Sequence, residues 1–313
     1  MEWLFRTDMG LVAPASHGNS PDAGQERVLT RRRWTRRRFL QWMGALAAGS
    51  GATAAYTRLV EPRWLDVERV TLQVPGLPER LAGTTLAQIS DIHLSEYFSP
   101  ERLLQTVQLV NRLAPRWVML TGDYVGRDPE AARGLVEPLR HLDAPAFAVL
   151  GNHDLWTDAS LVARSLAEGA VSLLRNQAIP LADGLWLAGL DDVWSGRPDL
   201  TQALANVPSA AVTLLMVHEP DFFSQVVRRE APVAVQFSGH SHGGQVRLPR
   251  LRRDGLGLEL YAPILPRYGR HYPMGLQRVG ERQVYTSRGI GVWPLPYRFN
   301  CRPEVSLFTL QPA

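Results

Sequence analysis

Five short apolar runs are the most informative feature of this 313-residue chain, since each is followed within a few residues by Asp, Asn or His. The runs cover residues 85–89, 117–120, 146–150, 212–217 and 233–237. Strands of an open α/β sheet bind ligands at their carboxyl ends, where loops on a rigid scaffold place side chains against one another. We therefore expect an α/β fold in which polar residues that are distant in sequence meet at one place.

Hydrophobic periodicity predicts the elements around these runs. Further strands are expected at 67–74 and 186–190, and helices at 100–113, 129–142, 160–167 and 222–229. Residues 243–313 are rich in Gly and Pro, so short strands and long loops are expected there. Short apolar strands separated by helices favour a sheet that is covered by helices on both faces.

Each polar cluster, taken alone, has an ordinary structural explanation. Asp91 and His93 would share one face of an extended segment, but such a pair is also common at a protein surface. Asp123 follows a glycine and has two oxygens with which to bridge two cations, yet a helix cap or a turn is the simpler explanation. Asn152 and His153 also follow a glycine, which is typical of a plain turn.

The histidines favour a joint explanation. His218 alone would be a buried core histidine, and His240 and His242 would be incidental members of a Gly-rich turn. Yet five of the eight histidines in the chain lie at these strand ends. The single cysteine excludes cysteine-rich zinc modules. Nitrogen and oxygen ligands without thiolate suit Mn, Fe or Zn, and two such ions close together can activate a water for displacement at phosphorus.

The positive charge of the chain lies at its N-terminus. Residues 1–58 contain nine arginines against four acids, whereas residues 59–313 contain 25 arginines against 26 acids. A near-neutral body argues against a broad nucleic-acid-binding surface, so no nucleic-acid partner is expected. The sequence therefore predicts a leader over residues 1–58 and a single domain over residues 59–313.

The leader is typical of an export signal. Arg36 and Arg37 precede Phe39 and a Gly/Ala-rich uncharged run at 42–57, and this order resembles a twin-arginine signal. It predicts export by the twin-arginine machinery to the periplasm or cell envelope. A membrane anchor at 42–57 is the second interpretation, because a span needs ~20 strongly apolar residues. A basic face before an ordinary core helix is the third. Residues 1–30 are expected to be disordered.

The motifs have a characteristic order along the chain. They read DIH at 91–93, GDY at 122–124, GNHD at 151–154, VHE at 217–219 and GHSH at 239–242. Together they resemble the calcineurin-like metallophosphoesterases over about residues 64–313. The run from Arg288 to Glu304 is similar to the exported or membrane-associated bacterial branch of that superfamily. The resemblance implies a four-layer α/β/β/α sandwich with mixed sheets and helices outside.

The resemblance also implies a role for each site residue. One divalent metal would be held by Asp91, His93 and His242, and a second by Asn152, His218 and His240. Asp123 would bridge the two metals. His153 would protonate the leaving oxygen, and Asp154 would orient and charge-stabilise the His153 imidazole. The implied enzyme is a hydrolase of phosphoric esters that cleaves a phosphodiester or pyrophosphate with a metal-activated water.

Residues 247–266 combine arginines with apolar side chains. Arg250, Arg252 and Arg253 lie beside Leu, Tyr and Ile residues, and such a surface could bind an anionic head group and cover an acyl chain. We therefore expect a lipid or cell-envelope substrate, with a solvated basic loop as the alternative. Three other functions stay open: a phosphomonoesterase on small soluble substrates, a metal-binding envelope module without turnover, and a nuclease. The near-neutral body and the export signal count against the nuclease.

Overall fold

The computed structural model describes residues 35–252 and 254–313. The chain divides into two compact units, Met1–Ala48 and Gly49–Ala313, and every strand among the described residues lies in the second. The disorder predicted for residues 1–30 and the role predicted for Arg253 concern positions outside the described residues. The functional division predicted at residue 58 stays a prediction.

Two six-stranded mixed sheets form the centre of the second unit. In spatial order, the first sheet contains β1 (Asp66–Val74), β14 (Glu304–Pro312), β2 (Thr85–Ile89), β3 (Trp117–Thr121), β4 (Ala146–Val149) and β5 (Val171–Leu173). The second contains β12 (Gly275–Val279), β13 (Arg282–Thr286), β9 (Val235–Ser238), β8 (Val212–Met216), β7 (Leu185–Gly189) and β6 (Gln177–Ala182). Strands β2 to β5 run parallel, as do β7, β8, β9 and β13, so the loops that follow them leave each sheet at one edge.

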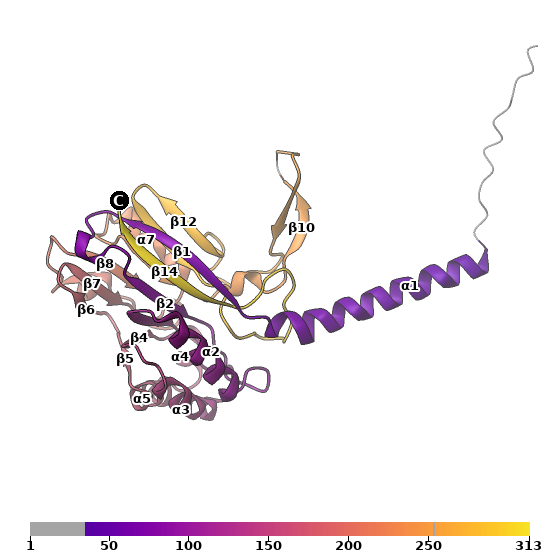
Figure 1. Cartoon of the computed structure of the whole chain (residues 1–313), viewed down its shortest axis with the longest axis horizontal. Coiled ribbons are helices and arrows are strands. Elements are labelled where there is room, and N and C mark those ends of the chain that lie inside the picture. Colours follow the sequence, from indigo (N-terminus) through magenta and orange to yellow (C-terminus); the bar gives the residue numbers. More distant parts are fainter. Residues whose placement is uncertain (1–34, 253) are drawn as a thin grey trace, which may run out of the picture. The chain divides into compact units, whose positions relative to one another are not determined.

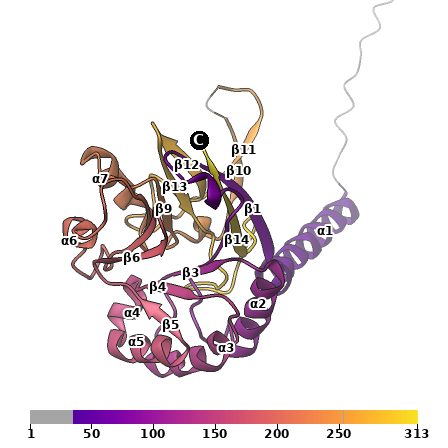
Figure 2. The ribbon, with the colours of Figure 1, turned by 60° about the vertical axis from the view of Figure 1, so that its left-hand side comes forward.

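Helices cover the outer face of each sheet (Figure 2). On the first sheet these are α2 (Pro100–Leu113), α3 (Val136–Arg140) and α5 (Ala159–Glu168); on the second they are α6 (Leu200–Leu204) and α7 (Phe223–Arg228). Alternate side chains of a strand point to opposite faces of its sheet. Leu120 of β3 therefore packs in the core under the helices, whereas its neighbour Met119 belongs to the core between the sheets, as does Met216 of the other sheet. This arrangement is the predicted α/β/β/α sandwich.

Most of the predicted elements are confirmed, but two differ. The strand at 85–89 and the helix at 100–113 have the predicted bounds, whereas the helix predicted at 129–142 begins as a 3-10 helix, Pro129–Leu135. The expectation of only short strands after residue 243 is wrong, because β14 has nine residues and lies between β1 and β2. Its partners lie more than 200 residues away in the chain, and local periodicity cannot detect such pairing.

Two segments belong to neither of the two six-stranded sheets. Strands β10 (Leu248–Leu251) and β11 (Leu258–Tyr261) form a separate antiparallel hairpin that projects from the second unit (Figure 1). Helix α1 (Arg36–Ala55) buries none of its side chains. Among residues 35–252 and 254–313, no helix has both the length and the apolar character that crossing a membrane requires.

Candidate metal centre

The two sheets bring six of the seven predicted ligands into one buried cluster. Loops after β2, β3 and β4 carry Asp91, His93, Asp123 and Asn152, and loops after β8 and β9 carry His218, His240 and His242. Three groups of potential ligand atoms, each within 4.8 Å of one another, include six of these residues and His153: Asp91/His93/His242, His93/Asp123/His153 and Asp123/His218/His240. Asp123 belongs to two of the groups, as a bridging carboxylate would.

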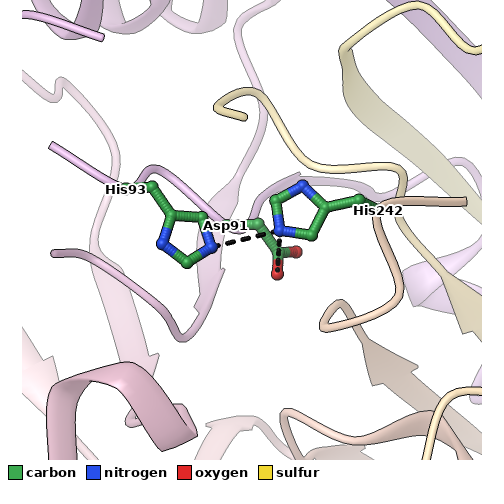
Figure 3. A group of neighbouring side chains, drawn as sticks. All are labelled: Asp91, His93 and His242. Atoms are coloured by element: carbon green, nitrogen blue, oxygen red, sulfur yellow. Dashed lines mark hydrogen bonds and ion pairs between the residues drawn. The ribbon is translucent and has the colours of Figure 1, made fainter. Parts of the chain in front are cut away.

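The distances within the cluster are short. His93 Nε2 lies 3.1 Å from His242 Nε2, which in turn is 3.5 Å from Asp91 Oδ1; Figure 3 shows these three side chains pointing toward one another. Asp123 Oδ2 lies 3.1 Å from His218 Nε2 and 3.6 Å from His93 Nε2. All five side chains are at most 8% exposed, so the donor atoms converge in a place with little water.

The backbone at these ligands is left-handed. Asp91, His93, Asp123, His240 and His242 have φ angles of 53°, 47°, 57°, 68° and 50°. The prediction that Asp91 and His93 share a face of an extended segment is therefore wrong, although they do meet. A non-glycine residue in a sparsely populated region costs on the order of 1–3 kcal/mol, and such residues cluster at functional sites. Hydrogen bonds between the loops maintain this geometry, for example from His93 N to Asp123 O at 3.0 Å.

Backbone carbonyls fix the orientation of the imidazole rings. His93 Nδ1 lies 3.2 Å from Val125 O, and His218 Nδ1 lies 2.6 Å from Thr121 O, so Nε2 of each ring faces the cluster. In His240 the Nε2 atom instead lies 2.7 Å from the carbonyl oxygen of Arg267, so Nδ1 is the ring nitrogen that is available to bind a cation. Such outer partners orient metal-binding histidines and set their tautomers.

Several buried polar atoms of the cluster lack a hydrogen-bond partner among the described residues. They are Asp91 Oδ2, Asn152 Oδ1, His218 Nε2 and His242 Nδ1. Unsatisfied buried polar atoms are rare in folded proteins, and an ion is one accepted explanation. Because the donors are imidazole nitrogens, carboxylates and an amide, the set fits divalent cations of the Mn, Fe or Zn type. The unpartnered, buried oxygen of Asn152 is compatible with a ligand role, which stays a prediction.

Burial and mutual charge set the protonation of the cluster. Burial lowers the pKa of His93 to about 3 and that of His240 to about 4, which keeps these imidazoles neutral and able to bind a cation. Burial alone would raise the pKa of Asp123, but the charge and hydrogen bond of His218, together with the nearby His153 and His93, outweigh it and hold the pKa well below its usual range. Asp123 is therefore an ionised carboxylate within the cluster.

Asp154 has a different role from the one predicted. Its carboxylate accepts hydrogen bonds from the backbone N–H groups of Asp123, Tyr124 and Gly151 at 2.8–2.9 Å. The partner of His153 Nδ1 is the carbonyl of Gly126, at 3.0 Å. Asp154 lies in the first turn of α4 (Asn152–Trp156), where a carboxylate reaches back to free N–H groups. It therefore positions Asp123, and Gly126 orients His153.

Aromatic residues that the sequence reasoning missed surround the histidines. The Trp293 ring stacks on His93 at 5.4 Å and lies edge-on to His153 at 4.6 Å. Trp156 contacts His153 at 4.9 Å, and Trp194 contacts His240 at 5.8 Å. Trp156 follows the GNHD motif by two residues, a proximity that could have identified it. These rings thus pack directly against three imidazoles of the cluster.

Comparison with known proteins agrees with the motifs. The calcineurin-like phosphoesterase family model matches residues 84–244. The metallophosphoesterase YkuE of Bacillus subtilis is 35% identical over 294 residues, covering 90% of this chain and 99% of YkuE. The phosphodiesterase YaeI of Escherichia coli is 32% identical, covering 88% of this chain and 99% of YaeI. The UDP-2,3-diacylglucosamine pyrophosphatase LpxG of Chlamydia muridarum is 27% identical, covering 84% of this chain and 94% of LpxG.

The family match includes every loop that carries a residue of the cluster, from Asp91 to His242. Members of this family depend on divalent metals, and the clustered donors in this chain suit that requirement. The chain belongs to the calcineurin-like phosphoesterases and is a hydrolase that acts on phosphoric ester bonds.

Proposed function

We propose that the protein hydrolyses a phosphodiester or pyrophosphate bond in a lipid or cell-envelope substrate, after export by the twin-arginine route. The observation that carries the enzymatic part is His153, an imidazole that adjoins the ligand cluster without being one of the seven predicted ligands. A protein that only bound metal would have no need of a proton donor at that position.

His153 has the geometry of a general acid. Two divalent cations, bound by the seven predicted ligands, would supply an activated water and neutralise charge on the phosphate. The Gly126 carbonyl accepts a hydrogen bond from His153 Nδ1–H, so Nε2 is the atom that would deliver a proton to the leaving oxygen. Trp293 and Trp156 border this imidazole and reduce competition from bulk water.

Two relatives support a diester or a pyrophosphate rather than a monoester. YaeI is named a phosphodiesterase, and LpxG is named a pyrophosphatase of a diacylated sugar nucleotide. Both align with more than four fifths of this chain. A phosphomonoesterase on small soluble substrates is the alternative, and the experiment below distinguishes them.

The β10–β11 hairpin supports a lipid-linked substrate. Its register places Pro249, Leu251, Leu258 and Leu260 on one face. Leu251 and Leu258 are 71% and 68% exposed, and Leu256 at the tip is 81% exposed. An exposed apolar face of this kind is typical of a surface that meets lipid or another partner.

The arginines of the hairpin contribute less than we expected from the sequence. Arg250 pairs with Glu259 at 2.8 Å, and Arg252 pairs with Asp254 at 3.0 Å. Their charges are already compensated, so they attract an anionic head group weakly. The leucines of the apolar face are the better candidates for contact with an acyl chain.

The test uses purified, metal-loaded protein and three substrates: an aryl phosphodiester, the matching monoester and a lipid-linked diester in mixed micelles. We expect the diesters to turn over faster than the monoester, and the lipid diester fastest. The double variant Leu251→Asp/Leu258→Asp should lose the preference for lipid, by about tenfold or more, since each leucine contributes more than 1 kcal/mol when buried. Val279→Asp, at an exposed position on β12, is the matched control.

Faster turnover of the monoester would favour the alternative function. Equal rates on the soluble and lipid diesters, unaffected by the hairpin variant, would exclude a lipid substrate. Metal binding without turnover of any substrate would leave a metal-binding module.

A further inference from the structure

Three arginines converge on a small pocket that the metal centre does not use. Arg58, Arg63 and Arg102 line a cavity of about 270 Å³. They come from three segments: the π-helical turn Tyr56–Val60, the 3-10 turn Glu61–Arg63 and the first turn of α2. Leu59, Pro62, Glu96, Tyr97, Val292 and Pro296 complete the wall.

The three arginines of this pocket bond to neutral oxygens, although the carboxylate of Glu96 also lines the pocket. Arg58 donates to the Tyr297 hydroxyl at 3.3 Å, and Arg63 donates to the Leu59 carbonyl at 2.8 Å. Arg102 donates to the carbonyls of Tyr97 and Pro62 at 2.9 and 2.8 Å. None of the three arginines makes an ion pair with a carboxylate in the part of the chain that the structure describes.

Three arginines against one carboxylate, that of Glu96, give the pocket an excess of positive charge, which favours an anion as ligand. Partial burial lowers the pKa of Arg102, and the nearby charge of Arg63 acts in the same direction. A guanidinium has five N–H donors, so each of these arginines keeps several for a ligand after its contacts with neutral oxygens. Planar guanidinium groups match phosphate and carboxylate oxygens in pairs of parallel hydrogen bonds.

A larger cavity shares part of its wall with the arginine pocket. It measures about 750 Å³, and it shares Glu96 and Tyr97 with the arginine pocket. Trp293 forms part of its wall and also stacks on His93. The segment from His93 to Tyr97 thus has a predicted metal ligand at one end and the arginine pocket at the other. Leu94, Pro100 and Leu295 give one part of the larger cavity an apolar lining that suits an uncharged group, whereas Arg127, Asp128 and Glu130 give another part a charged lining.

We propose that the arginine pocket binds a second anionic group of the substrate, a phosphate or carboxylate, while the scissile phosphoester lies at the metal centre. The uncharged part of the substrate lies along the larger cavity between them. The proposal rests on the proposed function and adds to it a substrate class: a phosphoester that carries a further anionic group. Arg58, Arg63 and Arg102 would therefore select among diesters that the metal centre alone would treat alike.

The experiment compares two soluble p-nitrophenyl alkyl phosphodiesters of equal chain length. One chain ends in a methyl group and the other in a phosphonate, which the enzyme cannot hydrolyse. We expect kcat/KM to be about tenfold higher for the phosphonate-ended probe, because one charge-assisted hydrogen bond stabilises a complex by about that factor. The double variant Arg58→Gln/Arg63→Gln should lose that preference. Arg102 is left intact because it also ties α2 to Pro62. Arg80→Gln, which breaks an exposed ion pair with Asp183, is the control and should keep the preference.

The outcomes separate this proposal from the proposed function. Equal kcat/KM on both probes in the wild-type protein would overturn the arginine site and leave diester hydrolysis intact. An equal fall on both probes in the double variant would show a structural role and would also overturn it. Hydrolysis of neither probe by metal-loaded protein would overturn the proposed function and this inference together.

A last arm distinguishes the source of the anion. Vesicles of phosphatidylcholine with and without phosphatidylglycerol are floated with the wild-type and double-variant proteins. If the double variant loses binding to the anionic vesicles but keeps its preference between the probes, the pocket binds a membrane head group, and its assignment to the substrate is wrong. Unchanged flotation together with a lost preference supports the assignment.

Discussion

Asp123 is the side chain on which both halves of the cluster depend. Its Oδ2 atom faces His218 and His93, while its Oδ1 accepts the backbone N–H of His153 at 2.9 Å. Asp123→Asn replaces one oxygen by an amide group that cannot bind a cation and that would face either an imidazole or an N–H. We expect both metal positions to lose occupancy together, because a bridging ligand serves both.

Metal content per protein, measured by mass spectrometry after dialysis, checks this expectation. Arg133→Gln, which changes only an exposed ion pair with Glu130, serves as the control. Full occupancy with normal rates would show that Asp123 does not bridge.

His153→Ala tests the general acid separately from the metals. The side chain is not among the seven predicted ligands, so the variant should retain its metal. Loss of a positioned general acid costs about 10²–10⁴-fold in rate, and the effect falls as the leaving group becomes more acidic. We therefore expect a large loss for alkyl diesters and a small one for p-nitrophenyl diesters. A uniform loss across leaving groups would contradict the assignment.

At the scale of single residues, the sequence predicted which side chains meet but not how each is supported. The order of the motifs predicted Asp91, His93 and His242 as neighbours, because the residue types and their spacing are those of metal ligands. The backbone bonds of Asp154 could not be predicted, since they depend on where α4 begins relative to the loop after β3. The hydrogen bond from His153 to the backbone carbonyl of Gly126 could not be predicted either, because a backbone group carries no signal in the residue type.

At the scale of elements, the segment from Arg288 to Cys301 shows how one side chain can hold a loop. Arg298 is fully buried, and its guanidinium donates five hydrogen bonds to the carbonyls of Arg288, Gly289, Gly291 and Cys301. The same loop contacts the residues after β2, with Gly291 N donating to Asp91 O at 2.9 Å. The position of Asp91 therefore depends on the shape of this loop.

Arg298→Lys should destabilise the protein although it keeps the charge. A lysine ammonium has three donors on one atom and cannot reach carbonyls spread around a planar guanidinium. We expect a loss of about 2–4 kcal/mol in the free energy of unfolding, together with weaker metal binding. Urea titration of the metal-free protein measures the first effect. Arg278→Lys, at an exposed position on β12, should change the free energy by less than about 0.5 kcal/mol. Equal midpoints for the two variants would contradict this role for Arg298.

The elements that the sequence predicted well are those with a strong local period. Residues 100–113 form one amphipathic helix, and 85–89 form one buried strand, because burial acts on each segment by itself. The sequence pattern did not predict strand β14 as a long strand, because it follows a Gly/Pro-rich region. Its pairing with β1 brings the two ends of the domain together. No local pattern specifies a partner so distant in the chain.

For the molecule as a whole, each of the two units has large apolar side chains that are exposed to solvent among its described residues. In the second unit this surface is the leucine face of the β10–β11 hairpin. In α1 it includes Phe39, Leu40 and Trp42, which are 53%, 65% and 65% exposed. Exposed apolar faces of this kind are typical of surfaces that meet lipid or another partner, which is the basis of the proposed lipid-linked substrate.

The proposed export depends on Arg36 and Arg37, which stand at the start of α1 and make no ion pair in the part of the chain that the structure describes. Replacing both by Lys keeps the charge and the helical propensity, so electrostatic attraction to an anionic membrane is preserved. A receptor that reads the guanidinium pair would no longer respond to it. We therefore expect the variant to accumulate in the cytoplasmic fraction with its metal bound and its activity intact. The matched change of Arg32 and Arg33 to Lys should leave export normal. Normal export of the Arg36→Lys/Arg37→Lys variant would mean that the N-terminal segment is not a twin-arginine signal.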